Sequence, residues 1–486
     1  MLGDGPNIIA RFVLFFVWPL LALWMMKRSR QPLATFFGLF FAGLLLLPEQ
    51  TFFKLPGLPY LGKHAILPLS LISSLFLFHR GWLRRRLGGA PRFSLSAGIF
   101  FSAIVLSALI TGAANGDPLY FGATVLPGIS AYDGLHMAIS DLLRFFLPFY
   151  AARLLLRDAE SLRVFFHILV RAVLLASLIA LFEMRMSPQL HQWFYGFIPI
   201  DSWTQVIRSS GYRPLGFTRH GLAFVLYFLA AAIAAFALRR TQKKGDARRI
   251  GVWIAPYLVI VTLAFGSLGA TIYAVAGIAA LKLLPARFIM LAAIIAGSVV
   301  ASFPYQRYHG KIDTEAMVES ARANADEERA QSLEFRFMNE ELLLERVRDR
   351  LYVGWGEFGR ADVYDEFDGR RVTVRDGAWI IQLGDRGLIG LVWFFGMLLF
   401  PLFSLLFRFG RADRTHRRLL AALALLVAIS AADLLPNGAF HPLGFIFAGA
   451  LLGQLEALGD RVYIRARSAK KQLPDIIHRP LDPLMG

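Results

Sequence analysis

The chain has 486 residues, of which 56% are hydrophobic and 14% are aromatic, and its mean hydropathy is +0.52. These values exclude a disordered or collagen-like protein. The absence of cysteine excludes disulfides, thiolate catalysis and Cys-based metal sites. The apolar residues form long uninterrupted blocks, which a soluble chain of this length does not contain. The composition therefore predicts a membrane protein with many spans.

A membrane-spanning helix needs about 20 mostly apolar residues. Blocks that approach this length recur along the whole chain, so we expect an all-α polytopic membrane protein with about 12–14 transmembrane helices and a single transmembrane domain over residues 1–486. The blocks lie near residues 8–26, 34–48, 64–79, 94–113, 134–156, 163–183, 221–238, 250–267, 269–284, 286–303, 387–407, 418–436 and 442–458.

The loops between these blocks alternate in charge. The 52 Lys and Arg against 34 Asp and Glu give a net charge of +18, although only 18% of the residues are charged. If the first basic loop is cytoplasmic, alternation places every strongly basic loop on the same side, as the positive-inside rule requires. These loops are residues 27–30, 80–92, 153–163, 239–249, 282–287 and 408–418, with the tail 459–486.

This threading predicts a cytoplasmic C-terminus and an N-terminus on the outer face. The first block lacks a basic n-region and a small-residue cleavage site, so we interpret it as a retained span. Because topology and attraction to anionic membrane lipids account for the basic excess, we expect no nucleic-acid partner.

Two long loops fall on the outer side, at residues 184–220 and 304–376. Long loops in compact proteins tend to carry function. In the second loop, apolar residues recur every three or four positions between 337 and 351, which predicts an amphipathic helix on the membrane face. Three glycines in residues 354–359 then predict a turn with close backbone approach.

The first loop ends in an unusual concentration of positive charge. Arg208, Arg213, Arg219 and His220 lie just before a spanning block, on the side where the positive-inside rule predicts few cations. Guanidinium groups bind phosphate bidentately, so these residues form a candidate anion site. Contact with lipid headgroups is the alternative for Arg208 and Arg219.

In the second loop, Arg336 opens the predicted helix, where the helix dipole disfavours a cation, and this favours a ligand-binding role. Pairing with glutamates at i±4 is the alternative, and it is favoured for Arg346, Arg348 and Arg350.

Asp376 lies where the chain re-enters the membrane, accessible from outside. Desolvation there would raise its pKa toward neutrality, so it is a candidate general base. Asp385 and Arg386 lie deeper and are expected to form a local pair or a helix break.

Further polar residues lie within or beside the predicted spans. Asp141 and Arg144 are spaced to pair on one helical face, and Asp433 and His441 lie near the outer end of the last hairpin. The histidines are scattered, and no nucleotide-binding or zinc-protease motif is present. We therefore expect neither metal nor cofactor.

Three stretches resemble the O-antigen ligase and O-antigen (polysaccharide) polymerase superfamily. They are Arg-Pro-Leu-Gly-Phe at 213–217, Tyr-Val-Gly-Trp-Gly-Glu-Phe-Gly at 352–359 following Arg336, and the segment 376–390, which runs from Asp-Gly to Gly-Asp-Arg-Gly-Leu-Ile-Gly. The resemblance covers roughly residues 210–410, together with the pattern of many spans and one large late outer loop.

The resemblance implies a bacterial inner-membrane glycosyltransferase whose fold is related to other lipid-dependent (GT-C-like) glycosyltransferases. Such enzymes take glycan from an undecaprenyl-diphosphate-linked oligosaccharide on the periplasmic face, without metal or nucleotide. Polymerases pass the glycan to another lipid-linked repeat, and ligases pass it to lipid A–core. Ligases carry His-Asn where this chain has Asp376-Gly377, which favours a polymerase of O-antigen or exopolysaccharide.

Together, the residues and the resemblance predict roles for the candidate site. Arg213 and Arg336, with Arg219 and Arg208, bind the diphosphate, and Asp376 accepts the proton of the acceptor hydroxyl, with His220 as second choice. The aromatic residues expected to stack on sugars are Tyr352, Trp355 and Trp379.

The sequence is also compatible with two other functions. A transporter or flippase for the lipid-linked glycan would also need cations in a membrane cavity, but the two matching halves with interrupted helices expected of repeat-built transporters are not evident. A structural subunit of an export complex is a third reading. A polymerase is also expected to meet a chain-length regulator and export machinery.

Overall fold

The computed structural model describes residues 2–3, 5–54, 59–87, 94–200, 202–208, 211–242, 249–324, 327–438 and 440–472, with the backbone alone after residue 460. Parts of three predicted basic segments lie outside the described residues, namely 88–92, 243–248 and 473–486.

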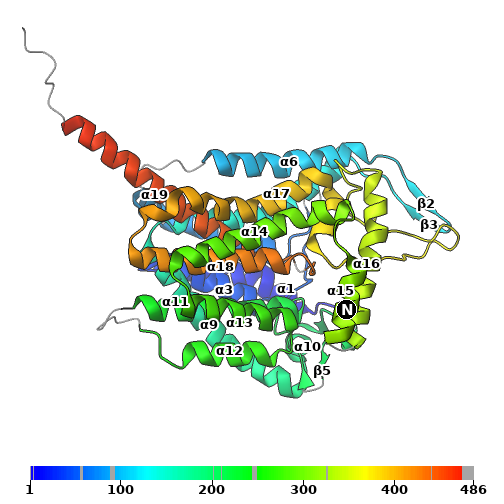
Figure 1. Ribbon diagram of the computed structural model, residues 1–486, viewed down its shortest axis with the longest axis horizontal. Helices are drawn as coiled ribbons and strands as arrows, with labels where there is room; N and C mark the ends of the chain where they lie inside the picture. Colours follow the sequence, from blue (N-terminus) through cyan, green and yellow to red (C-terminus); the bar gives the residue numbers. More distant parts are fainter. Residues whose placement is uncertain are drawn as a thin grey trace, which may run out of the picture.

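The described chain is mostly helical, and its long helices run roughly parallel to one another in one bundle (Figure 1). Eight helices of the described residues are long and apolar enough to cross a membrane. They are Ile8–Arg28 (α1, Ile8–Phe12; η1, Val13–Val17; α2, Trp18–Arg28), α6 (Leu95–Ala114), α9 (Ala159–Met186), α11 (Gly221–Thr241), α14 (Ala286–Tyr308), α17 (Ala378–Arg408, followed by η4, Phe409–Arg411), α18 (Arg414–Asp433) and α19 (Leu443–Gln472).

The remaining apolar blocks form shorter or interrupted helices. A ninth span is obtained if α4 (Lys63–Phe78) and α5 (Arg80–Leu87), bent by 93°, count as one. The shorter helices are α3 (Pro32–Leu46), α12 (Ile254–Ala264) and α13 (Leu268–Leu283), and a continuous run is formed by α7 (Ala131–Asp141), η2 (Leu142–Phe146) and α8 (Leu147–Leu155).

The polytopic all-α fold class is thus confirmed. Every predicted block falls on a helix, but length and composition support eight or nine spans among the described residues rather than 12–14. The count differs because three blocks form helices too short to span by themselves. The continuous run from α7 to α8 carries four charged residues (Asp133, Asp141, Arg144 and Arg153), which make it less apolar than the counted spans.

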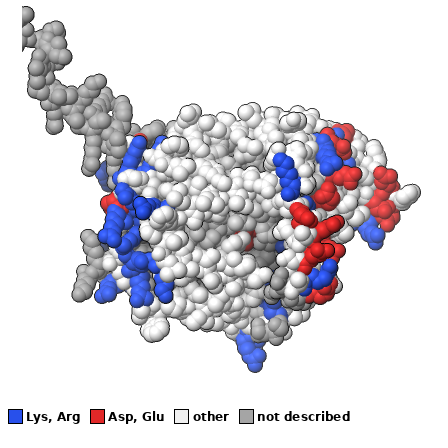
Figure 2. Space-filling model, viewed as in Figure 1, with Lys and Arg blue, Asp and Glu red and all other residues white. Residues whose placement is uncertain are grey.

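The two ends of the bundle differ in charge (Figure 2). Lys and Arg crowd one end, which we call the basic end, whereas the opposite end carries both signs and the belt between them is almost free of charge. At the basic end, Arg86 pairs with Asp158 at 2.6 Å and Arg157 with Asp460 at 2.7 Å. We call the opposite end the loop end.

The loop end carries the irregular and short elements. Helix α16 (Glu327–Arg348) crosses the ends of the spanning helices together with α15 (Thr314–Asn324) (Figure 1). Leu343, Leu344 and Val347 of α16 are buried, which confirms a helix with one apolar face in this loop. The other elements here are α10 (Leu190–Tyr195), η3 (Trp203–Gln205) and the paired strands β1 (Leu2–Gly3) with β4 (Phe197–Ile198), β2 (Leu119–Phe121) with β3 (Thr124–Leu126), and β5 (Ile207–Arg208) with β6 (Gly211–Tyr212).

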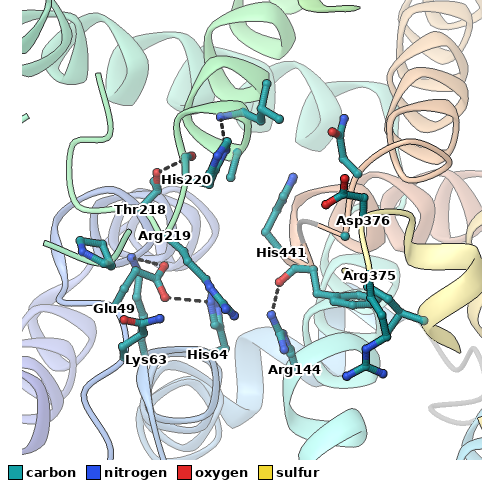
Figure 3. A pocket seen from close by; sticks show the side chains of 18 of the residues that line it. Glu49, Lys63, His64, Arg144, Thr218, Arg219, His220, Arg375, Asp376 and His441 are labelled. Atoms are coloured by element: carbon teal, nitrogen blue, oxygen red, sulfur yellow. Dashed lines mark hydrogen bonds and ion pairs between the residues drawn. The ribbon is translucent and has the colours of Figure 1, made fainter. Parts of the chain in front are cut away.

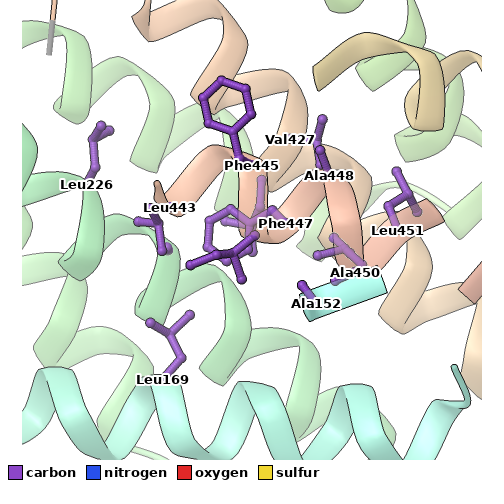
Figure 4. Close-up of a cluster of buried hydrophobic side chains, with 14 of the residues drawn as sticks. Ala152, Leu169, Leu226, Val427, Leu443, Phe445, Phe447, Ala448, Ala450 and Leu451 are labelled. Atoms are coloured by element: carbon purple, nitrogen blue, oxygen red, sulfur yellow. The ribbon is translucent and has the colours of Figure 1, made fainter. Parts of the chain in front are cut away.

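Helix α11 is the most enclosed of the spanning helices. It packs against α9, α12, α13 and α18, and most of its residues are buried. Leu226 of α11 belongs to the large apolar cluster that also contains Val427 of α18 and Phe447 of α19 (Figure 4). Because the cation-rich segment 208–220 leads into α11, it is anchored to the most enclosed helix of the bundle.

Candidate active site

A cavity of about 980 Å³ lies at the loop end, bordered by segments from the whole length of the chain. Six residues proposed from sequence line it together: Arg208, Arg213, Arg219, His220, Arg336 and Asp376. Figure 3 shows Arg219 and His220 on one side and Asp376 on the other, with His441 between them. Two distant loops, 184–220 and 304–376, therefore meet at one site.

The lining of the cavity is strongly cationic. Eight Lys and Arg side chains line it against three carboxylates. The cations are Lys63, Arg144, Arg208, Arg213, Arg219, Arg336, Arg371 and Arg375, and the acids are Glu49, Asp376 and Asp385. Such an excess, walled by low-dielectric protein, attracts an anionic ligand.

Two buried side chains hold the turn that carries Arg213 and His220. The carboxylate of Glu183 on α9 accepts hydrogen bonds from the backbone amides of Leu215 at 2.9 Å and Gly216 at 2.7 Å. The ammonium of Lys63 donates to the carbonyl of Phe217 at 2.8 Å. These hydrogen bonds pin the turn to α9 and α4.

Lys63 belongs to a cluster that sequence reasoning missed. Its Nζ lies 3.0 Å from Glu49 Oε1, and His64 Nε2 lies 3.5 Å from Glu49 Oε2. Despite burial, Lys63 and His64 hold the pKa of Glu49 well below its usual range. Glu49 is therefore an ionised structural partner rather than a base.

The guanidinium of Arg213 rests on the end of α12. Its Nε and Nη2 donate to the carbonyls of Phe265 at 3.5 Å and Gly266 at 3.3 Å. Burial, with Arg208 nearby, lowers the pKa of Arg213 to about 10, so it stays charged at neutral pH. Among the described residues no carboxylate lies within ion-pair distance of Arg213 or Arg219, and their charges face the cavity uncompensated.

His220 caps the N-terminus of α11. Its Nδ1 accepts the backbone N–H of Leu222 at 3.1 Å. Burial, followed by the charges of Arg213, Arg208, Arg219 and Arg336, lowers the pKa of His220 to about 4. The ring is therefore neutral at neutral pH with its proton assigned to Nε2, and it offers a donor rather than a base.

His441 repeats this arrangement before α19. Its Nδ1 accepts the N–H of Leu443 at 3.3 Å. Burial lowers the pKa of His441 to about 4, and the charges of His64 and Arg144 act in the same direction. Both histidines line the cavity (Figure 3).

Arg336 and Asp376 contact each other. The Nε of Arg336 lies 3.4 Å from Asp376 Oδ2, and the two side chains are 36% and 41% exposed. Burial raises the pKa of Asp376, whereas Arg336 acts to lower it. The carboxylate is thus reachable from the cavity and has a raised proton affinity, both of which a general base needs.

Arg144 is the principal lining residue that the sequence did not identify as a site residue. It was expected to pair with Asp141, but that expectation is wrong, because Asp141 pairs with Arg386 of α17 at 3.1 Å. Arg144 lies in the π-helical turn η2, and such turns are frequent at functional sites. Its Nη2 donates to the carbonyl of Phe440, and its Nε is buried without a hydrogen-bond partner among the described residues.

The local pair expected between Asp385 and Arg386 does not form either. Asp385 pairs with Arg375, which also contacts Asp362 at 2.8 Å. Arg386 turns away to Asp141 and Glu357. Neighbouring residues on α17 point to different partners because they lie on different faces of the helix, next to the kink at Gly387.

Three aromatic residues expected to stack on sugars do not line the cavity. Trp379 is fully buried, and its indole donates to Glu340 at 3.3 Å. Trp355 is 5% exposed and lies under the guanidinium groups of Arg346 and Arg350, at 3.5 and 4.4 Å from the ring centre. Tyr352 is exposed outside the lining.

Within the part of the chain that the structure describes, no three His, Asp or Glu side chains are grouped as metal ligands. Comparison with known proteins adds no assignment. No model of a known protein family matches the chain, and no curated protein matches it.

Proposed function

We propose that the protein is a glycosyltransferase that takes glycan from a polyprenyl-diphosphate donor at the loop end of the bundle. One observation carries the proposal. The six residues selected from two separate loops line a single cation-rich cavity, together with Arg144, Lys63 and two neutral histidines. By the positive-inside rule the basic end faces the cytoplasm, so the loop end faces the periplasm of a bacterial inner membrane.

In this proposal the diphosphate binds where positive charge is uncompensated. Arg213, Arg219 and Arg144 line the same cavity, and among the described residues none of them forms an ion pair with a carboxylate within 4.0 Å. Glu49, Asp141 and Glu357 still act on Arg144 from a greater distance. A diphosphate gathers negative charge as its bond to the sugar breaks, and preorganised guanidinium groups stabilise that charge. The Nε2–H groups of His220 and His441 supply further donors without adding repulsion between cations.

The reaction is one substitution at the sugar. The acceptor hydroxyl oxygen attacks C1 of the donor sugar, and the bond from C1 to the diphosphate oxygen breaks. The bonding electrons leave with the polyprenyl diphosphate, and the hydroxyl proton passes to Asp376. Every atom is accounted for without a metal or a nucleotide, because the diphosphate is already a leaving group.

Arg336 couples donor binding to the base. Its guanidinium lies against Asp376. When a donor phosphate takes over this guanidinium, Asp376 loses its nearest cation, and its pKa rises beyond the rise that burial already causes. Donor binding thereby prepares the carboxylate to accept a proton.

We propose further that the acceptor is another lipid-linked repeat, which makes the protein a polysaccharide polymerase. The support is the carboxylate Asp376 at the position where the resembling ligases carry histidine. A ligase, with lipid A–core as acceptor, is the alternative within the same chemistry.

The test is reconstitution. Purified full-length protein in liposomes receives an undecaprenyl-diphosphate-linked oligosaccharide and no other acceptor, in EDTA, and products are resolved on gels and by mass spectrometry. A ladder of lipid-linked multiples supports a polymerase, whereas transfer only after lipid A–core is added identifies a ligase. If neither product forms when the lipid reaches the loop end, the glycosyltransferase proposal is rejected and transport becomes the better reading.

A further inference from the structure

A second, apolar pocket adjoins the cation-rich cavity beneath α16. It has a volume of about 180 Å³ and lies between α15, α16 and the loop-end termini of α14, α17 and α18. Its apolar lining consists of Phe303, Met317, Leu333, Phe337, Leu343, Val374, Ile380, Leu435 and Pro436.

Two charged residues line both spaces. Arg336 and Asp376 border the large cavity and the apolar pocket alike. The third charged residue of the pocket, Glu340, is already engaged by Arg307 at 3.2 Å and Trp379 at 3.3 Å. A ligand in the pocket therefore meets hydrocarbon on most sides and, where the pocket adjoins the cavity, the guanidinium of Arg336 with its partner Asp376. This is the lining that an amphiphile with a phosphate head requires.

The walls of the pocket are fixed independently of any ligand. The guanidinium of Arg307 lies 5.3 Å from the ring centre of Phe337 while it also pairs with Glu340. Phe303 packs edge-on against Trp379, with ring centres 5.5 Å apart. Because these contacts hold α14, α16 and α17 together, the pocket is preformed.

We infer that this pocket binds the first isoprene unit of the polyprenyl chain whose phosphate is held by Arg336. The inference rests on the proposed function, because it takes the diphosphate-binding cavity as given. At roughly 30 Å³ per water-sized group, the pocket has room for about six such groups, close to the five carbons of one isoprene unit. The rest of a long chain continues into the bilayer.

The surroundings of the pocket suit a chain that arrives from the membrane. Met317 and Val374 of its lining are 45% and 46% exposed, and their neighbours Phe335 and Met338 on α16 are 47% and 55% exposed. Large apolar side chains at this level of the bundle favour contact with lipid over contact with water. A polyprenyl chain can thus pass from the bilayer under α16 while its head reaches the cations.

The experiment uses water-soluble probes to measure the contribution of the hydrocarbon chain to binding apart from that of the diphosphate. Full-length protein in nanodiscs is titrated by calorimetry with inorganic diphosphate, dimethylallyl diphosphate and unbranched pentyl diphosphate. We expect dimethylallyl diphosphate to bind about tenfold more tightly than inorganic diphosphate, because burial of its chain adds an apolar contribution. We expect the affinity of pentyl diphosphate to exceed that of inorganic diphosphate by a smaller factor, since the shape of its chain differs from that of an isoprene unit.

A substitution that fills the apolar pocket tests whether the gain in affinity arises there. Leu333→Trp fills the pocket and is expected to remove the tenfold gain while it leaves the affinity for inorganic diphosphate unchanged. Leu342→Trp is the matched control, because it makes the same change at another half-buried leucine of α16 outside the lining. If Leu333→Trp unfolds the protein, Met317→Trp serves instead, with Met338→Trp as its control.

The outcomes distinguish the inference from the proposed function. Equal affinities of wild type for the inorganic and dimethylallyl probes, or a gain that survives Leu333→Trp, overturn the pocket assignment and leave the diphosphate site intact. An equal gain for pentyl diphosphate overturns the assignment to isoprene. Failure of every probe to bind wild type, or binding unaffected by Arg213→Gln, overturns the proposed function itself.

Discussion

The two walls of the large cavity use arginine in opposite ways. On the wall built by residues 208–220, Arg213 contacts only backbone carbonyls, and Arg219 has no carboxylate partner among the described residues. On the wall built by residues 336 and 371–385, every arginine of the lining pairs with a carboxylate: Arg336 with Asp376, Arg371 with Asp362, and Arg375 with Asp362 and Asp385.

This difference shows which wall can receive an anion. The charge of an arginine that is paired with a carboxylate is largely neutralised, so it attracts an anionic ligand weakly. An arginine without such a partner in a low-dielectric wall attracts an anion more strongly. In the proposed reaction, the first wall therefore provides most of the attraction for the diphosphate. The second wall positions the carboxylate that takes the proton and contributes only Arg336 to the donor. The expected effects of substitutions differ accordingly between the two walls.

The largest effect is expected at Arg213. Arg213→Lys keeps the charge but replaces a planar fork by a point charge, which cannot bind a phosphate bidentately. We expect kcat/KM to fall by about 10²–10³, measured as ladder formation in liposomes. Arg348→Lys, an exposed arginine of α16 outside the cavity, is the matched control and keeps full activity. Near-normal product from Arg213→Lys would show that Arg213 does not bind the diphosphate bidentately.

The next largest effect is expected at Arg144, which lines the cavity and forms no ion pair within 4.0 Å among the described residues. Arg144→Gln removes a guanidinium from the cavity but retains an amide that can donate to the carbonyl of Phe440. We expect a loss of about tenfold to hundredfold in kcat/KM, with a matching rise in the inhibition constant of inorganic diphosphate. Arg348→Gln is the control. An unchanged inhibition constant together with a lower melting temperature would show that Arg144 is purely structural.

Gly221 tests whether the first wall needs its exact shape. A Cβ added at residue 221 would lie 2.6 Å from both Cγ and Cδ of Arg213 and 2.9 Å from the carbonyl oxygen of Pro214. Gly221→Ala must therefore move Arg213, and we expect a loss of about tenfold, since small displacements of a positioning group are costly. Gly410→Ala, where the added carbon meets nothing within 4 Å, should have no effect. Wild-type activity of Gly221→Ala would mean that the position of Arg213 is not critical.

The features that depend on a short stretch of sequence could be predicted from the sequence alone. Apolar block length predicts the helices, and cations on the side where the topology rule disfavours them predict Arg213 and Arg219. Arg336 was selected as the first residue of a helix, and that premise is wrong, because α16 begins at Glu327. Arg144 could not be found in this way, because Asp141 three residues earlier offered a pairing, and the π-helical turn that redirects Arg144 leaves no composition signal.

Partners distant in the chain account for the other differences. Glu49 follows one apolar block and Lys63 begins the next, and only the fold brings them to the same turn as Phe217. Trp355 and Trp379 were predicted to stack on sugars because exposed and buried aromatics look the same in a loop sequence. Their indoles are instead buried against Arg346 and Glu340.

The smallest change in maximal rate is expected for a substitution of Arg336 on the second wall. Its main effect should be a shift in the pH dependence of kcat/KM. A general base must be deprotonated, so activity rises with pH through the pKa of Asp376. Burial raises this pKa and Arg336 lowers it. Arg336→Gln removes the lowering cation, the pKa rises further, and the acid limb of kcat/KM must move to higher pH. Above that limb, where Asp376 is ionised in both proteins, the rates should converge to within about tenfold.

Arg371→Gln is the control for this shift. It removes a cation from the same wall, but its partner is Asp362 and not Asp376, so the acid limb should stay where it is in the wild type. If both variants shift the limb equally, the effect reflects the net charge of the cavity rather than the contact between Arg336 and Asp376. If neither shifts it, the group that titrates is not Asp376. The division of labour between the two walls would then fail, because the paired wall would have no part in proton transfer.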